Sequence, residues 1–288
     1  PYFTKLVEYI KKDRVPFDVP GHKMGIFEND MIAFLGKDVF RMDVNAPDGL
    51  DNLNVPKGVI KDSQALFADA FQAEHAFFLT GGTTLGILAL IMSTAKAKEK
   101  IIMPRNVHKS IISALIMSGA MPIFVEPVID EDLGIANHMP LESLKKQIAN
   151  HPDAKAVLII NPTYFGVASN IEEIVDIVHQ HNMLVLADEA HGSHMVFSDE
   201  LPMTAMQAGA DLSATSIHKT SGSLTQSSAI LAQGSRFDYT RLVATIHMVQ
   251  STSPSALLLA SLDVARKAMY FQAKDKIENL IPKVREMI

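Results

Sequence analysis

The chain has 288 residues, of which 48% are hydrophobic, so it can bury a sizeable core as one large domain or two modest ones. Its formal net charge of -6 offers no basic surface for nucleic acid, and the lack of cysteine excludes disulfides, thiolate catalysis and cysteine metal sites. The longest apolar runs are far shorter than a membrane span, and we therefore expect a soluble, cytoplasmic protein that binds neither nucleic acid nor membrane.

Residues 1–57 are predicted to form one helix and two polar loops. Segment 2–12 has a helical spacing of its apolar side chains, which are Phe3, Leu6, Val7 and Ile10. Segment 19–25 contains Pro-Gly and a second glycine, which disfavour any regular element. Segment 43–56 is the second polar loop.

The remaining chain, 58–288, is predicted to be one large α/β domain. A helix over 58–72 comes first, and short apolar runs then alternate with segments of helical period. The predicted strands are 76–79, 101–103, 122–125, 157–160, 184–187 and 212–215. The predicted helices between them include 85–95, 109–118, 141–149 and 171–181. This alternation favours a mostly parallel sheet flanked by helices, in which ligands bind at the carboxyl ends of the strands.

The first polar segment after a predicted strand is Thr80-Gly81-Gly82-Thr83-Thr84. Two glycines allow a tight turn, and backbone amides at the start of the next helix, together with two hydroxyls, suit a phosphate. A structural turn with a threonine cap explains the same residues. No P-loop lysine follows, which argues against a nucleoside triphosphate.

Two further polar segments follow predicted strands, and each has a structural and a functional explanation. His108, within Arg105-Asn106-Val107-His108-Lys109-Ser110, either caps the next helix or faces a ligand. In Asn161-Pro162-Thr163-Tyr164 the proline forces a turn. Asn161 and Thr163 either stabilise that turn or direct polar groups into a cleft.

Asp188 ends a buried apolar strand, at the start of Asp188-Glu189-Ala190-His191-Gly192-Ser193-His194. A carboxylate in this place is costly unless something neutralises it. A metal held by Asp188, His191 and His194 is one partner, but the spacing matches no standard metal motif. A protonated ring nitrogen of a cofactor is the partner that we favour. The pattern assigns no role to Glu189 or His194.

Lys219 follows the last predicted strand, within Ser216-Ile217-His218-Lys219-Thr220. Most lysines are solvated tips on helix faces, so the residue type alone does not single it out. Its neighbours do, because an amine among small polar groups at the carboxyl end of a strand loses its proton more easily and can attack a carbonyl.

These motifs, in this order, resemble the bacterial ornithine/lysine/arginine decarboxylase family. The match consists of Gly-Gly-Thr-Thr, Asn-x-His-Lys-Ser, Asn-Pro-Thr-Tyr, Asp-Glu-Ala-His-Gly and Ser-x-His-Lys, followed by Gln226-Ser227-Ser228. Pro20-Gly21-His22-Lys23 also matches, although the role of this loop stays open. The resemblance covers nearly the whole chain. It implies the pyridoxal-phosphate fold type I, with a large domain similar to that of aspartate aminotransferase.

The resemblance further implies pyridoxal 5'-phosphate as the cofactor and no metal. By this analogy Lys219 anchors the cofactor, Asp188 pairs with the ring nitrogen and His108 stacks on the ring. His191 lies near the ring hydroxyl, and Thr163 lines the cofactor. The residues that would bind the phosphate are Gly82, Thr83, Thr84, Ser216 and His218.

The implied reaction is decarboxylation of a basic amino acid, which is arginine, lysine or ornithine, to the amine and carbon dioxide. Aminotransferases and lyases share this cofactor machinery, and a truncated, non-catalytic subunit is a third alternative. In the family, loop 250–255 with Thr252 approaches the cofactor phosphate of a neighbouring subunit, which implies a homodimer or higher homo-oligomer with shared active sites. The family also has a small C-terminal domain, which we expect to be missing because the chain ends within a predicted helix at 286–288.

Overall fold

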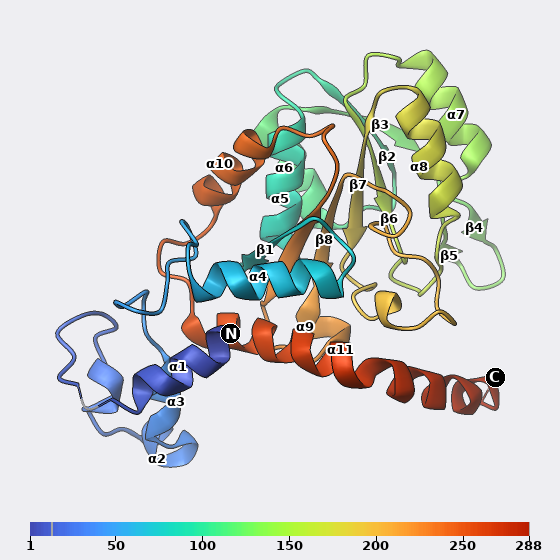
Figure 1. Cartoon of the computed structure of the whole chain (residues 1–288). Helices are drawn as coiled ribbons and strands as arrows, with labels where there is room; N and C mark the ends of the chain where they lie inside the picture. Colours follow the sequence, from blue (N-terminus) through green and yellow to red (C-terminus); the bar gives the residue numbers. More distant parts are fainter. Residues whose placement is uncertain (13, 288) are drawn as a thin grey trace.

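A seven-stranded sheet forms the centre of the molecule (Figure 1). The computed structural model describes residues 1–12 and 14–287, so Ile288, the last residue of the predicted large domain, lies outside the described residues. Across the sheet the strands follow the order β1-β9-β8-β7-β6-β2-β3. Their bounds are β1 (His75–Leu79), β2 (Lys100–Pro104), β3 (Met121–Val125), β6 (Ala156–Ile160), β7 (Leu184–Glu189), β8 (Leu212–Ser216) and β9 (Ser228–Ala232).

Strand direction decides where the loops meet. The neighbours β8, β7, β6, β2 and β3 pair in parallel, whereas β9 is antiparallel to both β1 and β8. All strands of this sheet except β9 therefore run in the same direction. As a result, the loops that follow β1, β2, β6, β7 and β8 emerge at one edge of the sheet.

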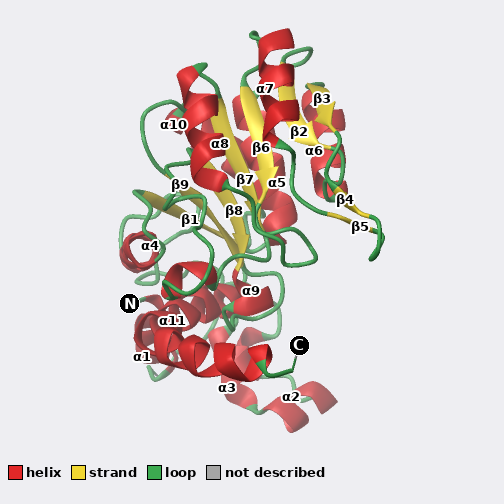
Figure 2. Ribbon diagram, turned by 90° about the vertical axis from the view of Figure 1, so that its right-hand side faces the viewer, coloured by secondary structure: helices red, strands yellow, loops and turns green. Residues whose placement is uncertain are grey.

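Helices cover both faces of this sheet and complete a three-layer arrangement (Figure 2). Side chains that alternate along a strand enter different cores, as Ile101 and Met103 join one cluster while Ile102 joins the other. The cluster with Ile101 is closed by α5 (Gly82–Thr94), α6 (Lys109–Ser118) and α10 (Tyr239–Val249). The other is closed by α4 (Val59–Ala70), α7 (Leu141–Asn150), α8 (Ile171–Gln180) and α11 (Ala256–Arg285).

The first 57 residues lie beside the start of α11, with α1 (Tyr2–Ile10), α2 (Asp30–Leu35) and α3 (Lys37–Met42) at the lower left of Figure 1. The buried side chains of α1 join the cluster that holds Phe67 of α4. The backbone N–H of Tyr2 donates to Ser63 Oγ at 3.0 Å, and that of Phe3 donates to Asp263 Oδ2 at 3.1 Å. These contacts attach α1 to both α4 and α11.

The two predicted polar loops have more structure than their composition indicates. Lys23–Gly25 forms one 3-10 turn (η1) where we expected no regular element, because the Gly25 N–H donates to the His22 carbonyl at 2.9 Å. Met24 and Gly25 take positive φ, so the turn does not continue as a regular helix. In the second loop, Asp51 accepts hydrogen bonds from the N–H groups of Gly58 at 2.7 Å and Ile60 at 3.1 Å. This loop therefore provides hydrogen-bond acceptors for backbone N–H groups at the start of α4, which have no partners within the helix.

The six predicted strands and six predicted helices are all present, with ends that differ by at most three residues. Strand β9, helix α10 and the hairpin of β4 (Ile129–Asp130) and β5 (Ile135–Ala136) were not predicted. Short elements were missed too, namely the six-residue helices α2 and α3, the one-turn helix α9 (Ile217–Thr220) and η2 (Met195–Phe197). Among residues 1–12 and 14–287, no helix is both long and apolar enough to cross a membrane.

Candidate active site

A cleft of about 780 Å³ opens at the edge of the sheet where the parallel strands end. Its walls come from the loops after five strands, together with Ala136 of the β4–β5 hairpin and the segment before β9. Ten of the eleven predicted site residues line it, and Thr252 does not. The ten are Gly82, Thr83, Thr84, His108, Thr163, Asp188, His191, Ser216, His218 and Lys219.

Lys219 lies on the one-turn helix α9, which begins directly after β8. Its Nζ is 3.1 Å from Nε2 of His191. Burial lowers the pKa of the Lys219 ammonium, and the negative charge of Asp188 opposes this shift. The net effect makes the neutral, nucleophilic amine more accessible than it is for an ordinary surface lysine.

His191 stands between Lys219 and the mouth of the cleft. Burial lowers the pKa of its imidazole, and the positive charges of Lys219 and His108 lower it further. The neutral imidazole is thus favoured, and its Nε2 can accept a hydrogen bond or a proton from the Lys219 ammonium. On its outer side the ring packs edge-on against Tyr164, with the ring centroids 5.4 Å apart.

Asp188 supplies the only carboxylate in the lining of the cleft, within the part of the chain that the structure describes. Its side chain is 5% exposed, and Oδ1 accepts a hydrogen bond from the Ala190 N–H at 3.1 Å. Burial raises the pKa of Asp188, whereas that hydrogen bond and the charges of His108 and Lys219 act in the opposite direction. A buried carboxylate with a single such donor is suited to a cationic partner.

Glu189 is buried behind the cleft. Successive strand residues face opposite sides, so Glu189 points away from Asp188 and is absent from the cleft lining. Its carboxylate accepts hydrogen bonds from the Ala205 N–H at 2.8 Å and from Ser213 Oγ at 2.7 Å. Burial raises its pKa to about 7. The alternation of side chains along β7 was the sequence signal that could have assigned Glu189 a structural role.

His194, the other residue left without a role, also lies outside the cleft lining. It is half-buried at the N-cap of η2, and burial lowers its pKa. The metal alternative required Asp188, His191 and His194 to converge. Within residues 1–12 and 14–287, no three acidic or histidine side chains are grouped so as to hold a metal ion.

Hydroxyls and amides gather at the start of α5. Thr83 Oγ1 and Ser216 Oγ are 2.5 Å apart, although 133 residues separate them in the chain. The N–H of Gly82 donates to the Gln226 carbonyl at 2.8 Å, so this amide is occupied. The amides of Thr83 and Thr84 lie in the first turn of α5, where backbone donors lack partners within the helix and an anion is favoured.

His108 both caps a helix and lines the cleft, so its two explanations are compatible. His108 is the N-cap of α6, where Nδ1 accepts from the Ser110 N–H at 3.2 Å, and the same exposed imidazole lines the cleft. His218 Nδ1 donates to the Ser227 carbonyl at 2.9 Å, which fixes the orientation of that ring. Thr163 Oγ1 faces the cleft and accepts from the Val167 N–H at 3.2 Å.

Asn161 belongs to the turn and not to the cleft. Its Nδ2 donates to the Met203 carbonyl at 3.1 Å, and its Oδ1 accepts from the Ser169 N–H at 3.1 Å. Both ends of the buried amide are therefore used to hold the loop after β6. The structure supports the structural explanation of Asn161, because this buried amide binds the backbone at both ends and does not line the cleft.

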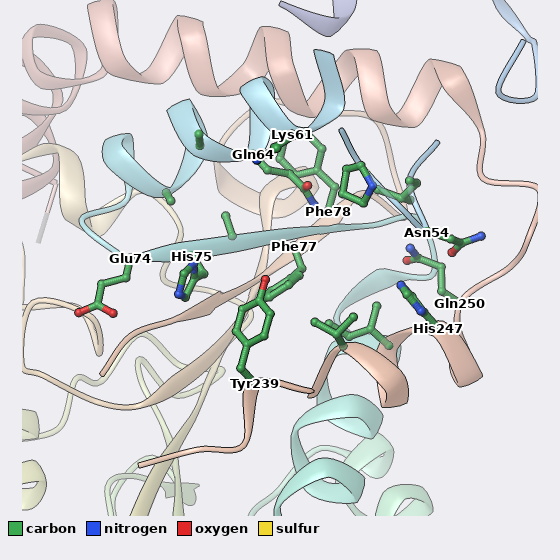
Figure 3. A pocket seen from close by; sticks show the side chains of 17 residues that line it. Asn54, Lys61, Gln64, Glu74, His75, Phe77, Phe78, Tyr239, His247 and Gln250 are labelled. Carbon is green, nitrogen blue, oxygen red and sulfur yellow. The ribbon is translucent and has the colours of Figure 1, made fainter. Parts of the chain in front are cut away.

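A second cavity of about 260 Å³ lies beside β1, the outermost strand of the sheet (Figure 3). Lys61 and Gln64 of α4 line it on one side of the strand, and Tyr239 and His247 of α10 on the other. No predicted site residue contributes to this lining. Thr252 is exposed between α10 and α11 and lines neither cavity.

The fold and the cleft define a class of protein. A mostly parallel sheet with one antiparallel strand, helices on both faces and a lysine directly after β8 form the large domain of fold-type-I pyridoxal-phosphate enzymes. The family model described as "Orn/Lys/Arg decarboxylase, major domain" matches residues 1–287, and the chain belongs to this family. The resemblance seen in the ordered motifs is thereby confirmed.

Individual relatives agree with this assignment. An arginine decarboxylase of Bacillus anthracis is 48% identical over 282 residues, which cover 98% of this chain and 57% of that protein. The structure of lysine decarboxylase A from Pseudomonas aeruginosa superposes with a TM-score of 0.89 at 27% identity, over 98% of this chain and 42% of that one.

A more distant neighbour shows the fold alone. It is a serine palmitoyltransferase from S. paucimobilis with bound PLP, which has a TM-score of 0.60 at 14% identity over 86% of this chain and 62% of that one. The chain spans less than two thirds of the length of each of these three proteins.

Proposed function

We propose that this chain is the major domain of a pyridoxal-phosphate-dependent decarboxylase that converts a basic amino acid to its amine and carbon dioxide. The observation that carries the proposal is the convergence of the Lys219 amine, the His191 imidazole and the buried Asp188 carboxylate in one cleft. The name of the Bacillus anthracis relative favours arginine among the three basic amino acids.

The residues of the cleft fit this cofactor. A volume of about 780 Å³ is within the range of small-molecule sites. Asp188 is buried and has one N–H donor, so a cationic ring nitrogen would complete its hydrogen bonding. Hydroxyls of Thr83, Thr84 and Ser216 offer donors to a phosphate beside the first-turn amides of α5. When bound, pyridoxal phosphate supplies an electron sink for the electron pair that carbon dioxide leaves behind.

The chain's own groups would then bind, orient and move protons. As a neutral amine, which its lowered pKa favours, Lys219 would hold the cofactor covalently. As an ammonium it would donate a proton to His191 Nε2, 3.1 Å away, which would later return it. Asp188 keeps positive charge at the closed end of the cleft. His108 and Thr163 are assigned to cofactor contact by their motifs and their exposure to the cleft.

We also propose that the active protein is a homodimer or a higher homo-oligomer in which Thr252 contributes to the cofactor site of the neighbouring subunit. Its loop is exposed and takes no part in this chain's own cleft. The side chain of Asn45 contacts the same loop, with Nδ2 3.4 Å from Ser253 Oγ. In an oligomer, the loop with Thr252 and the segment around Asn45 would therefore approach the cleft of the neighbouring subunit together.

The first experiment is the visible absorbance spectrum of the purified protein before and after borohydride, followed by peptide mass mapping. We expect a yellow band that borohydride bleaches and an adduct on Lys219, with carbon dioxide released from arginine. Lys219→Ala should abolish the adduct and lower activity by at least roughly a thousandfold, because the nucleophile is lost. Lys274→Ala, at an exposed lysine of α11, is the matched control.

Three outcomes would contradict the proposal. A protein that cannot be reconstituted with the cofactor would remove the cofactor assignment. An adduct on another lysine would remove the role of Lys219. Consumption of a keto acid without release of carbon dioxide would identify an aminotransferase instead.

A further inference from the structure

Two exposed aromatic side chains stand at the mouth of the cleft. Tyr164 is 78% exposed and Phe165 is 53% exposed, and both line the cleft from the loop between β6 and α8. Their rings meet edge-on, with centroids 5.5 Å apart. Large exposed apolar surface beside a ligand cleft marks a contact surface. The segment that carries the pair is held by hydrogen bonds, because Thr163 Oγ1 accepts from the Val167 N–H and the Asn161 side chain binds Ser169 and Met203.

This aromatic pair is close to the reactive amine. Lys219 Nζ contacts His191 Nε2 at 3.1 Å, and the His191 ring packs against Tyr164 at 5.4 Å between centroids. Tyr164 is therefore the next group outward from Lys219. An amino acid whose α-amine binds near Lys219 has its side chain within reach of the Tyr164 ring.

The charges of the cleft leave a cationic side chain with few partners. In the part of the chain that the structure describes, Asp188 is the only carboxylate in the lining, and it is 5% exposed. Besides Tyr164, the other ionisable side chains in the lining are Lys219, His108, His191 and His218, which carry no negative charge to attract a cation. An aromatic ring attracts one through the negative charge of its π face.

We propose that Tyr164, with Phe165, forms the subsite for the cationic end of the substrate's side chain and favours a guanidinium over an ammonium. A guanidinium is planar and weakly hydrated, so it stacks on an aromatic ring at a lower desolvation cost than an ammonium does. This inference rests on the proposed function, whose substrate it narrows to arginine.

The test measures equilibrium binding of amines that cannot be decarboxylated to the cofactor-loaded protein by calorimetry. The three probes are agmatine, which carries a guanidinium, N-carbamoylputrescine, its uncharged urea counterpart, and cadaverine, which carries an ammonium. Tyr164→Leu should weaken agmatine binding roughly tenfold, because it removes the ring. It should change binding of N-carbamoylputrescine less than about twofold, since that probe carries no cation.

Two further variants separate the ring from the hydroxyl and from general surface effects. Tyr164→Phe keeps the ring and should bind agmatine within about twofold of the wild type. Tyr270→Leu makes the same exchange at an exposed tyrosine of α11, outside the cleft, and should leave all three affinities unchanged. A larger loss for agmatine than for cadaverine supports the preference for guanidinium.

The subsite is overturned if Tyr164→Leu leaves agmatine affinity unchanged, if it weakens the charged and uncharged probes equally, or if the wild type binds no agmatine. Equal losses for agmatine and cadaverine overturn the preference for guanidinium. The proposed function is judged separately, because binding needs no turnover. If the protein binds agmatine through Tyr164 but releases no carbon dioxide, only the proposed function is contradicted. If it releases carbon dioxide but Tyr164→Leu leaves agmatine binding unchanged, only the subsite is contradicted.

Discussion

Two cavities border the same sheet, and their walls differ in chemistry. The large cleft is lined by loops that leave five strands in one direction, so Thr83, His108 and Lys219 converge there from distant parts of the chain. The smaller cavity lies along the side of β1, where α4 and α10 contribute apolar side chains together with Lys61, Gln64 and His247 (Figure 3). In the described part of the chain, its ionisable side chains are not joined by a contact like the one of 3.1 Å between Lys219 and His191 in the cleft.

The difference shows what the carboxyl edge of a parallel sheet contributes. Strand ends direct several loops toward one space, whereas the side of an outer strand meets only the helices packed next to it. Polar lining is common to both cavities. Ionisable groups that are close enough to shift one another's pKa are found in the cleft, as His191 demonstrates.

The largest effect is expected from neutralising the cleft's carboxylate. Asp188→Asn keeps the shape of the side chain but removes the charge proposed to hold a cationic ring nitrogen. Carbon dioxide release should fall roughly 10² to 10³-fold, while mass mapping still finds the cofactor on Lys219. Asp176→Asn, at an exposed position of α8, is the control. Activity within tenfold of the wild type would show that Asp188 is not the electrostatic partner.

A smaller effect, on stability and its pH dependence, is expected behind the cleft. The pKa of Glu189 is raised to about 7, so the folded protein binds a proton that the unfolded chain releases above its ordinary pKa. The contribution of Glu189 to the free energy of unfolding should therefore fall as pH rises from 4.5 through 7. Glu189→Gln should remove a loss of roughly 3 kcal/mol over this range.

Urea denaturation of wild type and variant at pH 4.5 and pH 8 measures this difference. Glu172→Gln, on the exposed side of α8, should keep the wild-type dependence. If Glu189→Gln loses the same free energy of unfolding between the two pH values as the wild type does, burial of this carboxyl group does not control the slope.

The smallest effect is expected in the cavity beside β1. Gln64 is buried, and its side chain makes no hydrogen bond with the described part of the chain, so an apolar group of similar size should be tolerated. Gln64→Leu should leave carbon dioxide release within about twofold and the free energy of unfolding within about 1 kcal/mol. A tenfold loss of activity would mean that this cavity is coupled to the cleft, and the contrast between the two regions would fail.

The sequence predicted the elements whose patterns are strong and missed those whose patterns are weak. Strands β6 and β7 are continuous apolar runs bounded by polar residues, and both were found. Strand β9 is a five-residue segment, Ser228–Ala232, whose only large apolar side chains are Ile230 and Leu231, so its local pattern is weak. Its antiparallel pairing with β1 and β8 is what makes it a strand.

The sequence by itself determined the α/β class, the positions of the strand ends and the kinds of side chain that follow them, because local periodicity and turn residues depend on near neighbours in the chain. Only the tertiary structure decided which partner each polar group takes. Lys219 meets His191, Thr83 meets Ser216 and the Gly82 amide meets Gln226. Hydrogen bonds require a fit of a few tenths of an ångström, and that fit is set by the packing of strands far apart in the chain.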